Sequence, residues 1–254
     1  MMKLSALIVA HNEQAHLAAC LDRLRFADEI VVVLDKCTDG SKEIAARYTK
    51  NLIEGSWDLE GPRRHAGIAA CQGGWILEVD ADERITPELA AEIKQTIASP
   101  SGDYYLIPVD NYIGQRLVRH GWGGSFGTSA VRRLWKKGHK HWGNERVHPK
   151  VTFTGKEGVA LKNPLIHYVD DTISDLWLRL DRYSTARARD LREGWKRGQK
   201  KESLARNIRR LFSRFIKCYC MRQGYREGGY GLLIALCASL FPLLSYLKAN
   251  LENE

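Results

Sequence analysis

The sequence predicts an α/β fold, with a mostly parallel central sheet flanked by helices and a basic, apolar helical extension at the C-terminal end. Two observations lead to this prediction. Between residues 4 and 98, short apolar runs without a helical period alternate with helical stretches of about ten residues. Between residues 179 and 226, 16 lysines and arginines stand against 4 acidic residues, in a chain of 254 residues with a net charge of +9.

Apolar and β-branched runs predict the strands, and the stretches between them predict the helices. The sheet strands are expected at residues 4–9, 29–34, 51–54 and 75–79. The helices are expected at residues 17–24, 41–48, 61–71 and 87–98, with Ser41 as the N-cap of the second. Further strands are expected at residues 104–109, 131–135 and 147–153, separated by glycine-rich and histidine-rich segments typical of a binding wall.

The length of the chain allows one large domain with an appended piece. We expect residues 1–170 to form that domain, with a donor-binding half at 1–98 and an acceptor half at 99–170. Residues 171–254 would form the helical extension.

Polar side chains follow three of the predicted strands directly. His11, Asn12 and Glu13 follow the first strand, residues 35–39 the second, and residues 80–82 the fourth. In parallel sheets of this kind, ligands bind at the carboxyl ends of the strands. We therefore expect the three clusters to face one crevice.

Asp80 and Asp82 are two residues apart, so on an extended backbone their carboxylates point the same way. Like charges this close repel each other unless a cation lies between them, and oxygen ligands suit Mg²⁺ or Mn²⁺. His167, after a predicted strand, is a further candidate ligand. The alternatives are that Asp82 caps the helix that starts near Pro87, that both acids are solvated turn residues, and that His167 is structural.

Four other side chains are candidates for binding a nucleotide diphosphate. Asp35 or Asp39 can accept a hydrogen bond from a nucleobase or a ribose hydroxyl. Arg63 and Arg64 open a predicted helix and can meet a diphosphate together with the amides of its N-terminus. Alternatively, Asp35 only ends a strand, and both arginines are solvated.

The segments ALIVAHNE, EIVVVLDKCTDGS and GPRRHAGIAACQGGWILEVDADE resemble, in this order, the N-terminal half of family 2 glycosyltransferases of the GT-A fold. The resemblance covers residues 3–83 closely. The later segments RLW, RVH and LIHY are similar to the branch that includes the lipopolysaccharide inner-core β-1,4-glucosyltransferases. The resemblance implies a Rossmann-like GT-A sheet and an inverting transfer of a sugar, glucose in that branch, from a nucleotide diphosphate donor to a lipid-linked acceptor.

The resemblance also implies roles for individual residues. Asp35 would contact the base of a UDP-sugar, Asp82 would bind Mg²⁺ or Mn²⁺, and Asp80 would face the donor sugar or ribose and the metal. Glu83 would support the two aspartates. The donor-binding residues would be Ala10, Asn12, Glu13, Asp35, Asp39, Arg63, Arg64 and Asp80.

The general base is expected near residue 148. Members of that branch often show Val-His-Glu where this chain has Val147-His148-Pro149, so the glutamate is missing. Glu145 is the first candidate in its place and His148 the second. On an extended segment their side chains take opposite faces, so the two candidates compete. Alternatively, Glu145 only pairs with Arg133 or Arg146.

The cysteines and the tail indicate where the protein works. The six cysteines show no metal-ligand spacing and no dense framework, so we expect reduced thiols, and His11 interrupts the first apolar run before it could serve as a signal peptide. Without a nucleic-acid-binding motif, the basic stretch is interpreted as binding an anionic membrane, with residues 232–247 in the acyl boundary. A surface hairpin interrupted at Pro242 is favoured over a span, and core packing is the alternative.

We therefore predict a metal-dependent, inverting hexosyltransferase at the cytoplasmic face of a bacterial inner membrane that extends the lipopolysaccharide inner core. The alternative enzymes act on another lipid-linked glycan or on a peptide. A nucleotide-sugar-binding protein without turnover is the alternative from another class. A non-enzymatic basic membrane or nucleic-acid binder is disfavoured by Asp80 and Asp82.

Overall fold

The computed structural model of the chain describes residues 3–123, 126–144 and 149–252, and the chain divides into two compact units. Unit 1 comprises Met1–Val109 and Ala130–His167, and unit 2 comprises Asp110–Ser129 and Tyr168–Glu254. The segment 110–129 belongs with the C-terminal helices because its apolar side chains, among them Val118 and Phe126, share a core with them. Whether residues 1–170 and 171–254 are separate domains stays a prediction.

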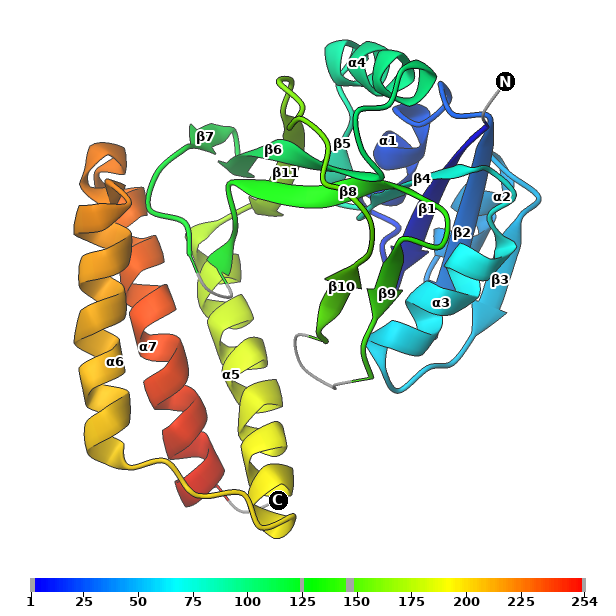
Figure 1. The fold of residues 1–254 in the computed structure, drawn as a ribbon. Coiled ribbons are helices and arrows are strands. Elements are labelled where there is room, and N and C mark those ends of the chain that lie inside the picture. Colours follow the sequence, from blue (N-terminus) through cyan, green and yellow to red (C-terminus); the bar gives the residue numbers. More distant parts are fainter. Residues whose placement is uncertain (1–2, 124–125, 145–148, 253–254) are drawn as a thin grey trace. The chain divides into compact units, whose positions relative to one another are not determined.

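Unit 1 is built on a mixed sheet whose first four strands are parallel (Figure 1). These strands are β1 (Leu4–Ala10), β2 (Glu29–Asp35), β3 (Leu52–Gly55) and β4 (Trp75–Val79). The other strands of this sheet are β5 (Glu83–Arg84), β6 (Tyr104–Ile113), β7 (Arg116–Val118), β8 (Ala130–Lys136) and β11 (Leu165–Asp170). Of these, β7 and the parts of β6 and β11 after Val109 and His167 belong to unit 2. The described strands follow the order β3-β2-β1-β4-β8-β6-β11-β5, with β7 on β6 and with β8 antiparallel to β4. The predicted α/β fold with a mostly parallel sheet is confirmed.

Helices cover both faces of this sheet. They are α1 (Leu17–Asp22), α2 (Ser41–Ala46), α3 (Glu60–Ala70) and α4 (Pro87–Ala98). Side chains alternate along β1, so Ile8 packs with α1 while Leu7 faces α3. The short strands β9 (Lys140–Trp142) and β10 (Val151–Phe153) form a separate antiparallel pair. The strand expected at 147–153 is thus described only as β10, because residues 145–148 lie outside the described part of the chain.

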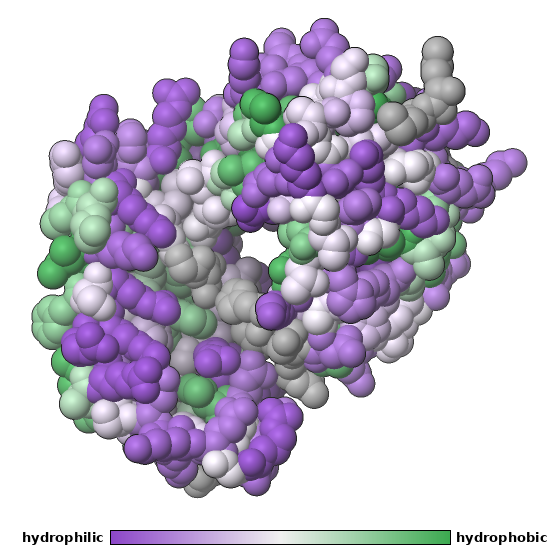
Figure 2. All heavy atoms as spheres, in the orientation of Figure 1, coloured by the Kyte–Doolittle hydropathy of each residue, from purple (hydrophilic) through white to green (hydrophobic). Residues whose placement is uncertain are grey.

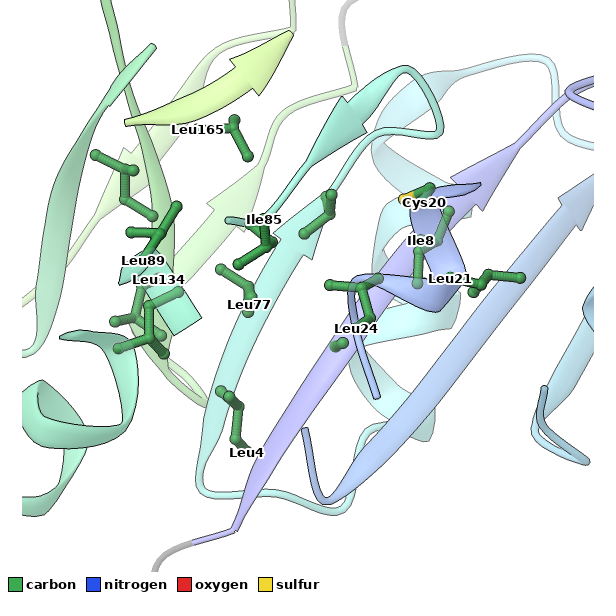
Figure 3. Close-up of a cluster of buried hydrophobic side chains, with 14 of the residues drawn as sticks. Leu4, Ile8, Cys20, Leu21, Leu24, Leu77, Ile85, Leu89, Leu134 and Leu165 are labelled. Atoms are coloured by element: carbon green, nitrogen blue, oxygen red, sulfur yellow. The ribbon is translucent and has the colours of Figure 1, made fainter. Parts of the chain in front are cut away.

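The larger core of unit 1 lies between the sheet and helices α1 and α4 (Figure 3). Leu4, Ile8 and Leu77 come from the sheet, and Leu21 and Leu89 come from the helices; all five are fully buried or nearly so. A second core on the opposite face packs α3 against β1 and β2.

Unit 2 is helical and has its own core (Figure 1). Its elements after β11 are α5 (Ile173–Lys196), α6 (Leu204–Ile216), the π-helical turn η2 (Lys217–Met221), the 3₁₀ turn η3 (Gly224–Glu227) and α7 (Gly229–Leu251). Helix α7 packs against both α5 and α6. A capping box starts α5, since the Thr172 hydroxyl accepts from Asp175 N while the Asp175 carboxylate accepts from Thr172 N.

The hairpin expected within residues 228–247 is wrong. The segment forms one continuous helix, α7, with Pro242 buried in its interior. Packing against α5 and α6 keeps the helix intact, because Ile234, Cys237 and Phe241 enter the shared core. Helix α7 is also long and apolar enough to cross a membrane, and its most apolar stretch has a mean hydropathy of 1.9. Half of that stretch is buried inside the protein.

Candidate functional site

The carboxyl ends of β1, β2 and β4 meet at one edge of the sheet, because these strands are parallel neighbours. His11, directly after β1, places its Nδ1 atom 2.6 Å from the backbone oxygen of Asp35, the last residue of β2. Ala10, the last residue of β1, offers its backbone oxygen to the Cys37 thiol at 3.5 Å. The polar clusters after β1 and β2 therefore meet at this edge, where the charges of Asp80 and Asp82 also act on Glu13. A crevice shared by the three clusters stays a prediction.

The loops after β1 and β2 are tied together by side chains. Asn12 adopts a left-handed backbone (φ 56°), and its Oδ1 accepts from Thr38 N at 2.8 Å. The Asp39 carboxylate accepts from Gln14 N at 3.0 Å and from Ser41 N at 3.1 Å. Asn12 and Asp39 therefore join the loop after β1 to the loop after β2.

The expectation that Ser41 caps α2 is wrong. The N-cap is Gly40, and Ser41 is the first residue of the helix. The Ser41 hydroxyl instead accepts from Glu13 N at 2.9 Å, which joins the start of α2 to the loop after β1. A side-chain oxygen already used in this tertiary contact is not available to cap its own helix.

Asp35 is buried and both of its carboxylate oxygens are engaged. Oδ1 accepts from Trp57 N at 3.0 Å, and Oδ2 accepts from Arg63 Nη1 at 3.0 Å. Arg63 contacts Asp35 through a single nitrogen and keeps part of its guanidinium exposed. Each oxygen keeps a second acceptor site, so a ligand donor can reach Asp35 where the little remaining exposure of the side chain allows it.

Arg64, the neighbour of Arg63, points to the inside of the protein. Its guanidinium donates to Glu60 at 3.0 Å, to Glu78 at 3.1 Å and to Asp80 Oδ1 at 3.0 Å. Only 6 % of Arg64 is exposed. A diphosphate contact for Arg63 and Arg64 stays a prediction, and the two arginines differ sharply in their surroundings.

Arg133 completes a buried charge cluster that sequence reasoning missed. From β8 its guanidinium contacts Asp80 Oδ2, Glu83 at 2.7 Å and Glu78 at 3.3 Å. Lys140 donates to the other oxygen of Glu78 at 3.0 Å. One signal was present in the sequence: Glu78 lies inside an apolar strand, where a buried carboxylate requires cationic partners.

These cations decide the charge of Asp80. Burial alone would raise its pKa, but Arg133 and Arg64 overcome this and hold the pKa well below its usual range. The backbone N–H of Asp80 donates to Glu83 at 2.8 Å, and burial raises the pKa of Glu83 to about 7. Burial also raises the pKa of Glu13 to about 7, with the charges of Asp82 and Asp80 adding to the effect. Asp80 is therefore ionised at neutral pH.

Asp82 differs from Asp80 in having a free ligand position. Its Oδ1 is buried, and no hydrogen-bond partner for it exists among the residues that the structure describes. Its Oδ2 lies 3.4 Å from His167 Nε2, and hydrogen bonding to Asp82 raises the pKa of His167 against the effect of burial. A carboxylate oxygen without a donor fits a divalent cation, and His167 would join as a ligand in its neutral form.

The described part of the chain contains no group of three or more His, Cys, Asp or Glu side chains arranged to hold a metal. A cation at Asp82 and His167 would thus take its remaining ligands from water or from a bound phosphate, as Mg²⁺ usually does. The residues present fit such an ion. The base candidates Glu145 and His148 lie outside the described residues.

The chain is similar to several known proteins. It is 26 % identical over 267 residues to the "Lipopolysaccharide core biosynthesis glycosyltransferase LpsC" of Rhizobium meliloti, covering 97 % of this chain and 92 % of the relative. It is 28 % identical over 261 residues to an uncharacterized glycosyltransferase of Rickettsia felis, covering 98 % of this chain and 88 % of the relative.

Solved structures share the fold. The crystal structure of S. aureus TarS 1-349 in complex with UDP matches with a TM-score of 0.52 at 15 % identity, over 98 % of this chain and 90 % of that chain. This likeness identifies the sheet and its helices as a GT-A fold. The family model "Glycosyl transferase family 2" matches residues 5–150, which is more than half of the sequence. The chain therefore belongs to glycosyl transferase family 2.

Proposed function

We propose that the protein transfers a sugar, glucose in the first instance, from a UDP-sugar to a lipid-linked acceptor with inversion at the anomeric carbon. One observation carries the proposal. Asp80 is held ionised by two guanidiniums, while Asp82, two residues on, keeps a buried oxygen that accepts no hydrogen bond from the described residues. A fixed anion beside a free ligand position suits a donor diphosphate and its cation.

The donor base is assigned to Asp35 and the diphosphate to Arg63. Asp35 is a fixed acceptor at the end of β2, which is what recognition of a base N–H requires. Arg63 donates to Asp35 through one nitrogen and lies 3.8 Å from Glu60, and part of its side chain is exposed, so it can turn to a phosphate oxygen. Arg64 is saturated by three carboxylates, and its role is to hold Asp80 in place.

The metal is assigned to Asp82 Oδ1 and His167, with Mg²⁺ or Mn²⁺ as the ion. When bound, the ion would offset the negative charge of the leaving diphosphate. Asp80, which is bound by Arg133, faces the donor. The Glu83 carboxylate holds the backbone of Asp80 by accepting a hydrogen bond from the Asp80 N–H. These contacts keep the two aspartates in place before the donor arrives.

The general base is assigned to Glu145, with His148 as the alternative. An inverting transfer needs a group that removes the acceptor proton on the face opposite the leaving diphosphate. Replacing Glu145 by Gln is expected to lower turnover by about 10²-fold while donor affinity stays unchanged. If His148→Ala has this effect and Glu145→Gln does not, the assignment is reversed.

The acceptor is assigned to the lipopolysaccharide inner core at the cytoplasmic face of a bacterial inner membrane. The similarity to a relative named for lipopolysaccharide core biosynthesis supports this assignment, as does the apolar, basic unit 2. Another lipid-linked glycan or a peptide is the alternative acceptor. The replacement of the family's Val-His-Glu glutamate by Pro149 favours a second candidate function, nucleotide-sugar binding without turnover.

A donor panel tests the proposal. Purified protein is mixed with nucleotide sugars, a deacylated core acceptor and Mn²⁺, and UDP release is measured together with binding of Mn²⁺ by its free-ion EPR signal. We expect release with one UDP-sugar, and we expect Asp82→Asn to abolish release and Mn²⁺ binding. Asp22→Asn, a matched change of an exposed acid on α1, is expected to alter neither. UDP release that changes neither with Asp82→Asn nor with a chelator would contradict the metal role. Donor binding without any UDP release would favour a nucleotide-sugar-binding protein without turnover.

A further inference from the structure

Helix α6 carries a stripe of apolar side chains on its water-facing side. Leu204, Ile208, Phe212 and Ile216 recur every fourth residue and so lie along one face of the helix. Each of them is between 42 and 62 % exposed. Scattered exposed apolar residues are ordinary, but a continuous stripe of this kind marks a surface that contacts something other than water.

The inner side of α6 carries both a polar residue and the partly buried Phe215, which packs against the core of unit 2. Asn207 points inward, is 1 % exposed, and returns its amide to Ser203 O at 3.1 Å. A helix of a soluble unit normally turns its apolar face to the core and its polar residues to water. In α6 a polar residue is buried while the stripe faces out, although α6 packs against α7. The stripe is therefore not the contact that holds α6 in unit 2.

The junction after α6 continues the exposed apolar character. Met221 in η2, Tyr225 in η3 and Leu232 at the start of α7 are all exposed. In Figure 2 hydrophobic residues (green) line the outer left edge of the α6 region, next to hydrophilic residues (purple) that face the viewer. Apolar and basic side chains thus occupy adjoining parts of one surface.

The charge around the stripe is strongly positive. Residues 197–226 contain ten lysines and arginines and one acidic residue, Glu202, which pairs with Arg210 at 2.5 Å. Arg206, Arg209 and Lys217 are exposed on α6 or directly after it. A stripe of apolar side chains flanked by cations matches an anionic lipid surface, in which acyl chains lie beneath phosphate groups.

A small cavity beside the end of α6 adds to this match. Arg214, Lys217 and Arg222 line a space of about 150 Å³ together with Gly123, Cys218 and Ala238. Three cations around a space of this size suit a phosphate group. The cavity lies at the end of α6, and Ile216 is not among its lining residues, so the cavity and the stripe are separate features of this region.

We propose that unit 2 docks onto an anionic bilayer through α6, with the stripe at the acyl boundary and its flanking cations at the phosphates. This proposal deepens the membrane location proposed above, and it assigns the docking to α6 rather than to the apolar helix α7. A nucleic acid would leave the stripe in water. A second copy of this chain would bring two stretches of the same strong positive charge together.

The test is sedimentation of the full chain with vesicles of phosphatidylcholine alone, or of phosphatidylcholine and phosphatidylglycerol in equal amounts. We expect binding to the anionic vesicles that weakens with salt. The double variant Phe212→Ser, Ile216→Ser should lower vesicle affinity by about tenfold or more. The double variant Arg206→Gln, Arg209→Gln should lower it by about fivefold for each cation removed. Val159→Ser, which changes a still more exposed apolar side chain in unit 1, should bind as the parent does.

Circular dichroism and thermal melting confirm that each variant is folded, which is expected because all changed side chains are exposed. Equal vesicle binding by the parent and the Phe212→Ser, Ile216→Ser variant would overturn the proposal. So would self-association of the parent in light scattering that the same variant abolishes, because the stripe would then join two copies. UDP release is measured separately with a soluble acceptor, so a failure of the proposed transfer is distinguishable from a failure of docking.

Discussion

Arg64 Nη2 lies 3.0 Å from Asp80 Oδ1 and joins helix α3 to the carboxyl end of β4. The same nitrogen reaches Glu60, so one buried cation ties a helix to the acid that ends the central strand. Arg133 reaches the other oxygen of Asp80 from β8. The position of Asp80 is thus fixed from two sides by groups that do not touch solvent freely.

Arg133→Met is expected to destabilise the protein strongly. The change removes the cation shared by Asp80, Glu78 and Glu83. Because Glu78 and Glu83 are buried, the expected cost is about 3–5 kcal/mol. Arg132→Met, at the next position of β8, breaks only an exposed pair with Glu157 and should cost at most about 1 kcal/mol. Urea unfolding followed by tryptophan fluorescence compares the two, and similar losses would contradict the buried cluster as a source of stability.

Glu13→Gln is expected to change the pH dependence of stability. Burial raises the pKa of Glu13 from 4.5 to about 7, so between these values the folded protein holds a proton that the unfolded chain has released. The stability contributed by this proton is complete below pH 4.5 and is lost as the pH rises through 7. Because a glutamine does not titrate, the free energy of unfolding of the variant should rise relative to that of the parent as the pH rises. The expected difference at pH 8 is about 1 kcal/mol, which allows for solvent screening at a half-buried site.

The measurement is urea unfolding of both proteins from pH 4.5 to 8 in the presence of a chelator. The raised pKa of Glu83 also lowers stability as the pH rises, but Glu83 is present in both proteins. The difference between their free energies of unfolding therefore reports on Glu13 alone. A difference that stays constant with pH would show that Glu13 titrates normally.

Gly67→Ala is expected to destabilise unit 1. Helix α3 approaches the sheet closely at Gly67, where a Cβ atom would lie 2.5 Å from Leu7 Cδ1 and 2.8 Å from Val33 Cγ2. Alanine favours a helix by up to about 1 kcal/mol, but overpacking costs about 1–3 kcal/mol, which leaves a net loss of about 1 kcal/mol. Thermal melting checks this against Gly74→Ala, where a Cβ would meet nothing within 4 Å and no loss is expected.

The strands and helices of unit 1 were predictable from sequence because their signals are local. Apolar runs such as that of β4, and the Pro87 start of α4, fall where they were expected. The strand-end rule also placed the residues after β1, β2 and β4 at one edge without a template. At these strands and helices, the element that the local sequence favours is also the one that packs in the folded protein.

The surroundings of Asp80 could not be predicted in the same way. Whether Arg63 or Arg64 points to the predicted crevice depends on the rotation of α3, which is set where Gly67 meets the sheet. The contact of Arg133 depends on β8 pairing with β4 across more than fifty residues of chain. No period or spacing in a single sequence carries either fact.

The tail shows a different limit. Its composition correctly suggested basic helices, but α7 combines a membrane-like composition with burial in the core of unit 2. Hydropathy cannot tell these two environments apart, because a buried helix and a lipid-facing helix contain the same residues. The exposed stripe of α6 is visible only once the buried side of that helix is known.

Strand β4 is hydrogen-bonded on both sides, to β1 and to β8. Its amide hydrogens should therefore be among the last in unit 1 to exchange with deuterated solvent, since exchange there requires the sheet to open. The acids at its end are carried by this slowly opening strand, while the loops after β1 and β2 are held mainly by side chains such as Asp39. Local unfolding can then free these loops while Asp80 keeps its place.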